Sequence, residues 1–260
     1  MVFQVAILTV TGLVMGSFMG LVSLRLPRGE DIVVRRSHCS HCEATLRPWH
    51  LVPLLSWAAM RGRCASCASP IPLRYPLFEA ASAGIGLWAA LHSPDLVSAL
   101  MTALLGWNLL LIAVVDGEHF WIPDVLSVPL FAAGLVAAVL LHPSGLPLSQ
   151  ALPQALVEPL VGAAAGFASL WLVALAYRSL RGRDGLGGGD PILFGAIGAW
   201  VGWIGLPSVL LYASLSGLSL ALARVLLRKP VSGTDALPFG VFLAIGAWLT
   251  WLYGPLGLTA

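Results

Sequence analysis

Long apolar stretches separated by short polar connections occupy most of this chain of 260 residues. A bilayer core about 30 Å thick requires about 20 apolar residues per helix, and eight stretches reach or approach that length. They are residues 2–24, 76–92, 96–115, 125–142, 158–177, 191–205, 207–227 and 238–254. Only 10% of the residues are charged, whereas a soluble domain carries about 25%, which excludes a soluble globular enzyme. The sequence therefore predicts an all-α polytopic membrane protein with about eight transmembrane helices.

The longest polar connection, residues 25–75, divides the chain into three regions. We expect a first transmembrane helix at 1–24, a small cytoplasmic domain at 25–75 and a membrane core of about seven helices at 76–260. The first stretch runs on without an A-x-A-like cleavage site, so we expect it to be a retained helix rather than a signal peptide.

Basic residues occur only in alternate connections, which predicts the orientation of the chain. Eight of the 14 Lys and Arg residues lie between Arg25 and Arg74. The other six are Arg178, Arg181, Arg183, Arg224, Arg228 and Lys229. Because basic loops stay in the cytoplasm, both termini are expected on the periplasmic side. The loop arginines can also contact anionic lipid, whereas the net charge of +2 is too small to indicate a nucleic-acid partner.

All four cysteines lie in the 25–75 connection, as two C-x-x-C pairs 21 residues apart. These are Cys39 with Cys42 and Cys64 with Cys67. Four thiolates at this spacing are typical of a structural zinc site. Two disulfides or four unused thiols are the alternatives, and a reducing cytoplasm argues against disulfides. Three nearby histidines are candidate substitute ligands: His38, His41 and His50.

Two carboxylates are expected at the same membrane face. Asp116 ends the third apolar stretch, and Asp190 follows Gly187-Gly188-Gly189 to open the sixth. Two adjacent carboxylates share a proton, and such a pair can activate water on a peptide carbonyl and protonate the leaving amine. The alternative is that Asp190 only caps a helix and that Asp116 is an ordinary helix-end acid.

The ordered set of motifs resembles the type IV prepilin peptidases, membrane aspartyl proteases of the GxGD class in the bacterial inner membrane. The matching motifs are Gly16-Ser17-Phe18 with Arg25-Leu26-Pro27, the two C-x-x-C pairs with Arg74-Tyr75-Pro76 and Glu79, Asp116 with Ile122-Pro123-Asp124, Gly187-Gly188-Gly189-Asp190, and Pro238-Phe239-Gly240.

The resemblance implies that Asp116 and Asp190 are the catalytic pair. It implies cleavage of the basic leader from type IV prepilins, or from the pseudopilins of type II secretion, at the cytoplasmic face. Members with the four-cysteine loop also methylate the new N-terminal amine with S-adenosylmethionine. Residues expected to support the site are Gly187, Gly189, Glu118, Asp124 and Glu79, and Asp184 is expected in the approach loop.

Three positions depart from the family pattern. Ile192 replaces a lysine that often follows the second aspartate, Gly20 replaces an asparagine, and Glu118 replaces an aspartate. No strand–glycine–helix fingerprint for a nucleotide is present, so the position of an S-adenosylmethionine site is not predicted. Peptidase activity without methyl transfer is therefore an alternative.

Two further alternatives are a transporter and a membrane scaffold. A transporter usually places its acids near the bilayer midplane, whereas the acids of this sequence gather at one face. A scaffold would use zinc to hold a partner-binding loop, with its aspartates only capping helices.

Overall fold

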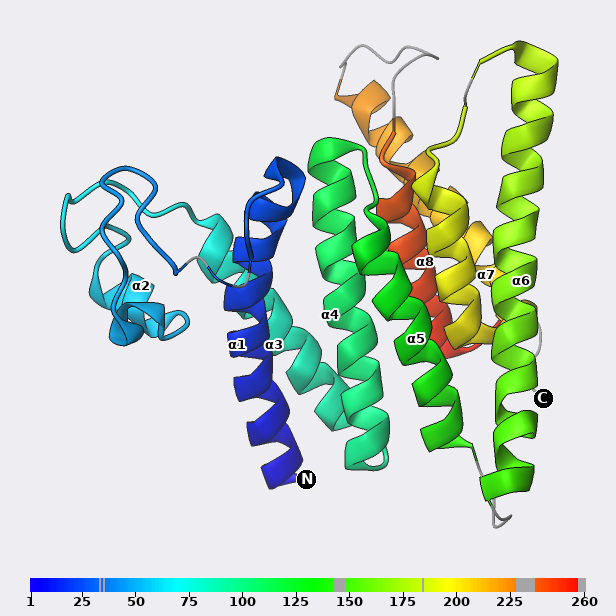
Figure 1. The fold of residues 1–260 in the computed structure, drawn as a ribbon, viewed down its shortest axis with the longest axis horizontal. Helices are drawn as coiled ribbons and strands as arrows, with labels where there is room; N and C mark the ends of the chain where they lie inside the picture. The colour runs from blue at the N-terminus through cyan, green and yellow to red at the C-terminus, as the bar shows by residue number, and fades with distance from the viewer. Residues whose placement is uncertain (33, 35, 143–147, 184, 228–236, 257–260) are drawn as a thin grey trace. The chain divides into compact units, whose positions relative to one another are not determined.

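Helices make up most of the residues that the structure describes. The structure is a computed structural model, and it describes all residues except 33, 35, 143–147, 184, 228–236 and 257–260. Within the described ranges the chain forms helices and two isolated antiparallel bridges, but no sheet. The helices are α1 (Val2–Arg25), α2 (Leu55–Ala59), α3 (Arg74–His92), α4 (Leu96–His119), α5 (Asp124–Leu141), α6 (Leu148–Arg181), α7 (Gly189–Leu226) and α8 (Phe239–Tyr253), with 3-10 turns η1 (Leu26–Arg28) and η2 (Pro48–Leu51) (Figure 1).

The chain divides into two compact units, Met1–Trp107 and Asn108–Ala260. The boundary falls inside α4, so the first half of that helix belongs to the first unit and the second half to the second unit.

The first unit is built on close packing between α1 and α3. A Cβ on Gly16 would lie 2.5 Å from the Phe78 carbonyl oxygen, and Gly12 faces the Ser82 carbonyl as closely. Glycines let two helix backbones approach in this way, and small residues of this kind are typical of helix interfaces in membranes. The indole Nε1 of buried Trp107 also donates a hydrogen bond to the Ser82 carbonyl, at 2.8 Å.

The second unit is built around α7. Gly162 of α6 faces the backbone of Gly198, and Gly246 of α8 faces the Val209 carbonyl, so both neighbours pack directly against the α7 backbone. On the α5 side, the Trp200 indole Nε1 donates to the Leu130 carbonyl at 2.8 Å, and both residues are buried. These contacts fix the helices that carry the second unit's polar residues.

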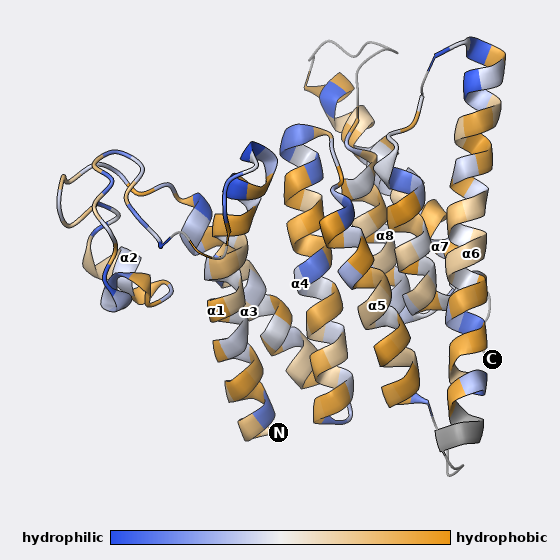
Figure 2. Cartoon of the chain, in the orientation of Figure 1, coloured by the Kyte–Doolittle hydropathy of each residue, from blue (hydrophilic) through white to orange (hydrophobic). Residues whose placement is uncertain are grey.

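The prediction of an all-α membrane protein is confirmed, but the number of clear spans differs. Among the described residues, five helices are long and apolar enough to cross a bilayer: α1, α4, α5, α6 and α7. Helix α8 is apolar but has only 15 residues. Helix α3 is not among the five, and its sequence includes Arg74, Glu79 and His92. Figure 2 shows apolar residues covering the long helices, with polar residues concentrated in the connections.

The sequence predicts separate sixth and seventh stretches that meet near Leu206 and Pro207, and the structure has this break a few residues earlier. The backbone within α7 is not helical at Gly202, where φ is 66° and ψ is 174°, so a helical segment lies on each side of that residue. Proline keeps a helical φ and removes only one hydrogen bond, so a helix can continue through Pro207. Glycine adopts the left-handed region that other residues avoid, which places the kink at Gly202.

Candidate active site and metal centre

Asp116 is a buried carboxylate near the end of α4. The helix continues to His119, so Asp116 lies inside its last turn rather than after it, with 4% of its surface exposed. The Val241 N–H, at the start of α8, donates a hydrogen bond of 3.1 Å to Asp116 Oδ2. The carboxylate is thus held by backbone from 125 residues further along the chain.

Asp190 is the second buried carboxylate, in the first turn of α7, with 5% of its surface exposed. The Gly187 N–H donates to Asp190 Oδ2 at 2.9 Å, and the Asp190 N–H donates to the Gly187 carbonyl at 3.1 Å. Gly188, not Asp190, is the N-cap residue. The glycine run therefore folds into a tight turn whose amide fixes the Asp190 side chain.

Ile122 brings the two aspartates to one place. A Cβ on Gly189, next to Asp190, would lie 2.7 Å from the Ile122 carbonyl oxygen. A Cβ on Gly240 would lie 2.6 Å from Ile122 Cδ1 and 2.9 Å from Asp116 Oδ2. Two adjacent carboxylates ionise as a coupled pair and share a proton.

The other predicted acids are placed differently. Glu118 and Asp124 are both exposed, with Glu118 Oε2 3.8 Å from His119 Nε2 and Asp124 in the first turn of α5. Glu79 belongs to the first unit, whereas both aspartates belong to the second. Asp184 lies outside the described residues. The structure therefore brings together Asp116, Asp190, Gly187 and Gly189.

The two cysteine pairs occupy turns of the same design in the segment between α1 and α3. Antiparallel bridges His38–Thr45 and Arg63–Pro70 close the two turns. Corresponding amides point at the first sulfur of each pair: the His41 N–H at Cys39 Sγ, 3.5 Å, and the Ser66 N–H at Cys64 Sγ, 3.4 Å. The residue after each second cysteine, Glu43 or Ala68, has a positive φ.

The four sulfur atoms lie within 4.8 Å of one another, and the Cys39 and Cys67 sulfurs are 3.8 Å apart. A tetrahedral zinc ion with Zn–S bonds of about 2.3 Å places its sulfurs about 3.8 Å apart, so the cluster fits such an ion. The 3.8 Å separation is far longer than a disulfide bond of about 2.05 Å, and all four cysteines are free. Among the described residues, no histidine joins this ligand group.

Hydrogen bonds favour the thiolate form of two of these ligands. The backbone N–H groups of His41 and Cys42 lower the pKa of Cys39 to about 6. The Ser69 hydroxyl and amide lower the pKa of the Cys67 thiol. Since the thiolate is the form that binds a metal, these bonds favour ligation by Cys39 and Cys67. The Ala44 N–H lowers the pKa of Cys42, but hydrogen bonds with the Cys67 and Cys39 thiols outweigh it and raise that pKa to about 11.

Comparison with known proteins identifies the family. Residues 10–93 match the Bacterial Peptidase A24 N-terminal domain, and residues 103–222 match the Type IV leader peptidase family. The chain belongs to the type IV leader peptidase family, which confirms the resemblance drawn from the motifs.

Three relatives give the same assignment. The chain is 36% identical to the Prepilin leader peptidase/N-methyltransferase of Pseudomonas aeruginosa, over 94% of this chain and 88% of that protein. The protein of that name from Burkholderia pseudomallei is 36% identical over 96% of this chain and 86% of its own. The Escherichia coli Type 4 prepilin-like proteins leader peptide-processing enzyme is 36% identical over 93% of this chain and 91% of its own. No solved structure gives a significant match.

Sequence reasoning missed the backbone that surrounds the carboxylates. The Pro238-Phe239-Gly240 motif was noted without a role, yet it places Gly240 and the Val241 N–H against Asp116. It also missed that Glu79, which is buried, accepts a 2.7 Å hydrogen bond from the Leu54 N–H. The motif itself was the only sequence signal for the first feature, and no local pattern links residues 54 and 79.

Proposed function

We propose that this chain is an aspartyl peptidase that removes the leader peptide from type IV prepilins, with Asp116 and Asp190 as its catalytic residues. The observation that supports this most directly is the pair of buried carboxylates of α4 and α7, which converge around Ile122. The family and its named relatives act on prepilin leaders.

The chemistry follows from a shared proton. One carboxylate, ionised, takes a proton from water as the oxygen attacks the scissile carbonyl, and the other, protonated, gives its proton to the leaving amine. The Val241 and Gly187 amides bind Oδ2 of Asp116 and Asp190 respectively, and so hold each carboxylate in one orientation. The backbone therefore positions both groups before substrate arrives.

Glu118 and Asp124 are exposed, which favours an indirect role in catalysis over direct contact with the substrate. We propose that they contribute negative charge around the site without touching the reacting atoms.

Ile192, in the position where the family often has lysine, is half-buried in the second turn of α7. Gly20 has the Tyr75 ring 3.2 Å from where its Cβ would be, so the glycine supports close packing of α1 on α3 where an asparagine would be crowded.

The protein belongs to the inner membrane, as its apolar helices and its relatives indicate. We further propose that both termini are periplasmic and that the catalytic pair faces the cytoplasm. The grouping of all basic residues in alternate connections supports this orientation. The substrate, a prepilin or a pseudopilin, would then present its basic leader on the side where the site opens.

We also propose N-methylation of the new N-terminal residue with S-adenosylmethionine, and zinc as the ion of the four-cysteine cluster. The first rests on the names of the relatives, and the second on the geometry of four free sulfurs. A closed four-thiolate site has no open position for substrate, so the zinc would hold the fold of the loop.

Intact-mass analysis of a prepilin after incubation with the purified protein tests both activities. We expect a shortened product, and a gain of about 14 Da, the mass of one CH₂ group, only when S-adenosylmethionine is present. Cleavage without the gain would leave a peptidase alone. No cleavage of any prepilin or pseudopilin would favour the transporter or scaffold alternative.

A further inference from the structure

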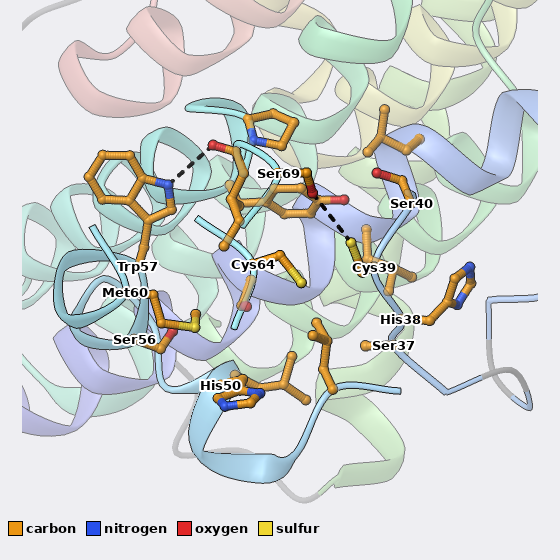
Figure 3. Close-up of a pocket in the computed structure, with 18 of the residues that line it drawn as sticks. Ser37, His38, Cys39, Ser40, His50, Ser56, Trp57, Met60, Cys64 and Ser69 are labelled. Carbon is orange, nitrogen blue, oxygen red and sulfur yellow. Dashed lines mark hydrogen bonds between the residues drawn. The ribbon is translucent and has the colours of Figure 1, made fainter. Parts of the chain in front are cut away.

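A cavity of about 220 Å³ lies within the first unit, and its lining includes none of the residues that the proposed cleavage uses. Its walls come from the end of α1, the start of α3 and the loop that carries α2 and the cysteines. Space of about 10–15 Å³ is enough to hold one water molecule, so the cavity has room for an organic ligand, and it is partly open to solvent. Figure 3 shows Trp57, Met60 and Ser56 on one side, with Cys39 and His38 across from them.

The lining combines apolar surface with two buried charges. Trp57, Met60 and Tyr75 contribute aromatic and thioether surface. Arg25 and Glu79 each have only 6% of their surface exposed, yet both line the cavity. A few placed polar groups in a mainly apolar lining are typical of a small-molecule site.

Both charges are held in place by the backbone of the loop. The Leu54 N–H donates to Glu79 Oε2 at 2.7 Å, and Leu54 has a positive φ of 57°, which is unfavourable for a leucine. Arg25 Nη1 donates to the Asp31 carbonyl at 3.0 Å, and Nη2 to the Arg36 carbonyl at 3.3 Å. The loop backbone thus binds Glu79 of α3 and Arg25 of α1, and the conformation of Leu54 carries local strain.

We propose that this cavity binds S-adenosylmethionine, so that the methyl donor is held in the first unit by residues of α1, α2 and α3. The inference rests on the N-methylation proposed above. The donor has a flat adenine ring, a positively charged sulfonium and ammonium group, and a carboxylate. The cavity offers a partner for each: aromatic rings, which attract both flat rings and cations, the Glu79 carboxylate and the Arg25 guanidinium.

The cavity shares a wall with the metal cluster. Cys39 and Cys64 both line the cavity and belong to the four-sulfur group. The Ser69 hydroxyl, also in the lining, lies 3.0 Å from Cys67 Sγ and 3.7 Å from Cys39 Sγ. A metal ion in the cluster would therefore fix this wall, which gives the zinc loop a role in donor binding without chemistry at the metal.

Isothermal titration calorimetry of the purified full chain with S-adenosylmethionine tests the site. The variant is Glu79→Gln, whose side chain has nearly the same shape as that of the wild type. Glu79→Gln keeps an oxygen to accept the Leu54 N–H but removes the charge. We expect its affinity to fall about tenfold or more, as for loss of a charged hydrogen-bond partner. Glu43→Gln is the matched control, since Glu43 is an exposed acid of the same loop outside the cavity, and its affinity should equal that of the wild type. Equal affinity for both variants would overturn the proposal.

Two further measurements separate a lost site from a misfolded loop. Ser56→Phe should fill the cavity and weaken binding while the zinc content stays unchanged. Ultraviolet cross-linking of radiolabelled S-adenosylmethionine should label a peptide that contains Trp57 or Tyr75, and label confined to other peptides would contradict the site. If the chain cleaves prepilin but binds no S-adenosylmethionine, this inference and the methylation fail while the peptidase stands. If the donor binds at the cavity but no prepilin is cleaved, the peptidase proposal fails instead.

Discussion

At the scale of single residues, glycines decide how closely backbone approaches the two aspartates. Gly240 leaves room for Asp116 and Ile122, and Gly189 leaves room for the Ile122 carbonyl. A side chain at either position would meet these atoms at under 3 Å, a separation that close packing does not allow. The positions of the two carboxylates therefore depend on glycines, which carry no functional group themselves.

Gly240→Ala should reduce leader cleavage strongly, by about tenfold or more, because a shift of about 1 Å in a catalytic group costs up to about 100-fold. The new methyl group would press on Asp116 Oδ2. The matched control is Gly217→Ala, whose Cβ would meet only the Phe242 ring at an ordinary 3.5 Å. Initial rates of prepilin cleavage check the pair, and wild-type rates in the Gly240 variant would contradict this account of the site.

A single cysteine substitution should empty the metal cluster. Cys39→Ser removes one of four thiolates, and we expect the zinc content by mass spectrometry to fall from one ion per chain to a small fraction. Ser66→Ala is the control, because only the Ser66 backbone N–H reaches Cys64 Sγ. Unchanged zinc in Cys39→Ser would show that the metal, if bound, has other ligands.

At the scale of elements, the path of α7 depends on one backbone conformation. The Gly202 φ of 66° breaks the helix where its flanking residues pack against α5, α6 and α8. The carboxylate of Glu158, in α6, would lie 2.9 Å from a Cβ at this position. Both the conformation and the space therefore require glycine.

Gly202→Ala should destabilise the protein by about 1–3 kcal/mol, the cost of a strained backbone conformation, plus the displacement of Glu158. Thermal unfolding in detergent should show the loss. Gly84→Ala is the control, since Gly84 has a helical conformation and open space around its Cβ position. A Gly202 variant as stable as the wild type would mean that neither the positive φ nor the contact with Glu158 requires glycine at this position.

The membrane-spanning helices were predictable from the sequence, whereas the break within α7 and the contacts between segments were not. The bilayer forces each span to satisfy its own backbone hydrogen bonds and to be apolar over about 20 residues, so the spans were visible as runs along the chain. The kink at Gly202 was not visible, because a proline five residues later gave the stronger local signal. Similarly, the glycine run before Asp190 predicted a close approach, but not its partner Ile122.

At the scale of the whole molecule, residues far apart in the sequence form the two candidate sites. Asp116 takes its hydrogen bond from Val241, and the cavity joins Arg25 to Glu79. A spacing rule predicts neighbours within one helix or turn, which is why the two C-x-x-C turns were predicted. Contacts between distant segments are set by packing, and only the family resemblance indicated which of them matter.

The charge distribution predicts the orientation of the molecule. If basic connections remain in the cytoplasm, an alkaline phosphatase reporter fused after Ala260 should be active and one inserted near Arg181 inactive. The reverse pattern would place the connections on the other side and would contradict a cytoplasmic site. Green fluorescent protein fusions at the same positions, which fluoresce only in the cytoplasm, provide the reciprocal control.

The central claim is that Asp116 and Asp190 together cleave a prepilin leader, and substitutions of equal size test it most directly. Asp116→Asn and Asp190→Asn should each lower the rate of leader cleavage at least about 1,000-fold, as removal of one member of a catalytic unit does. Asp95→Asn is the control and should cleave at the wild-type rate. Asp95 is an exposed acid that accepts hydrogen bonds from the Val97 and Ser98 N–H groups at the start of α4. Asn also fills this capping role. Loss in both variants, with wild-type zinc content, would support the pair. Wild-type cleavage by either variant would contradict it.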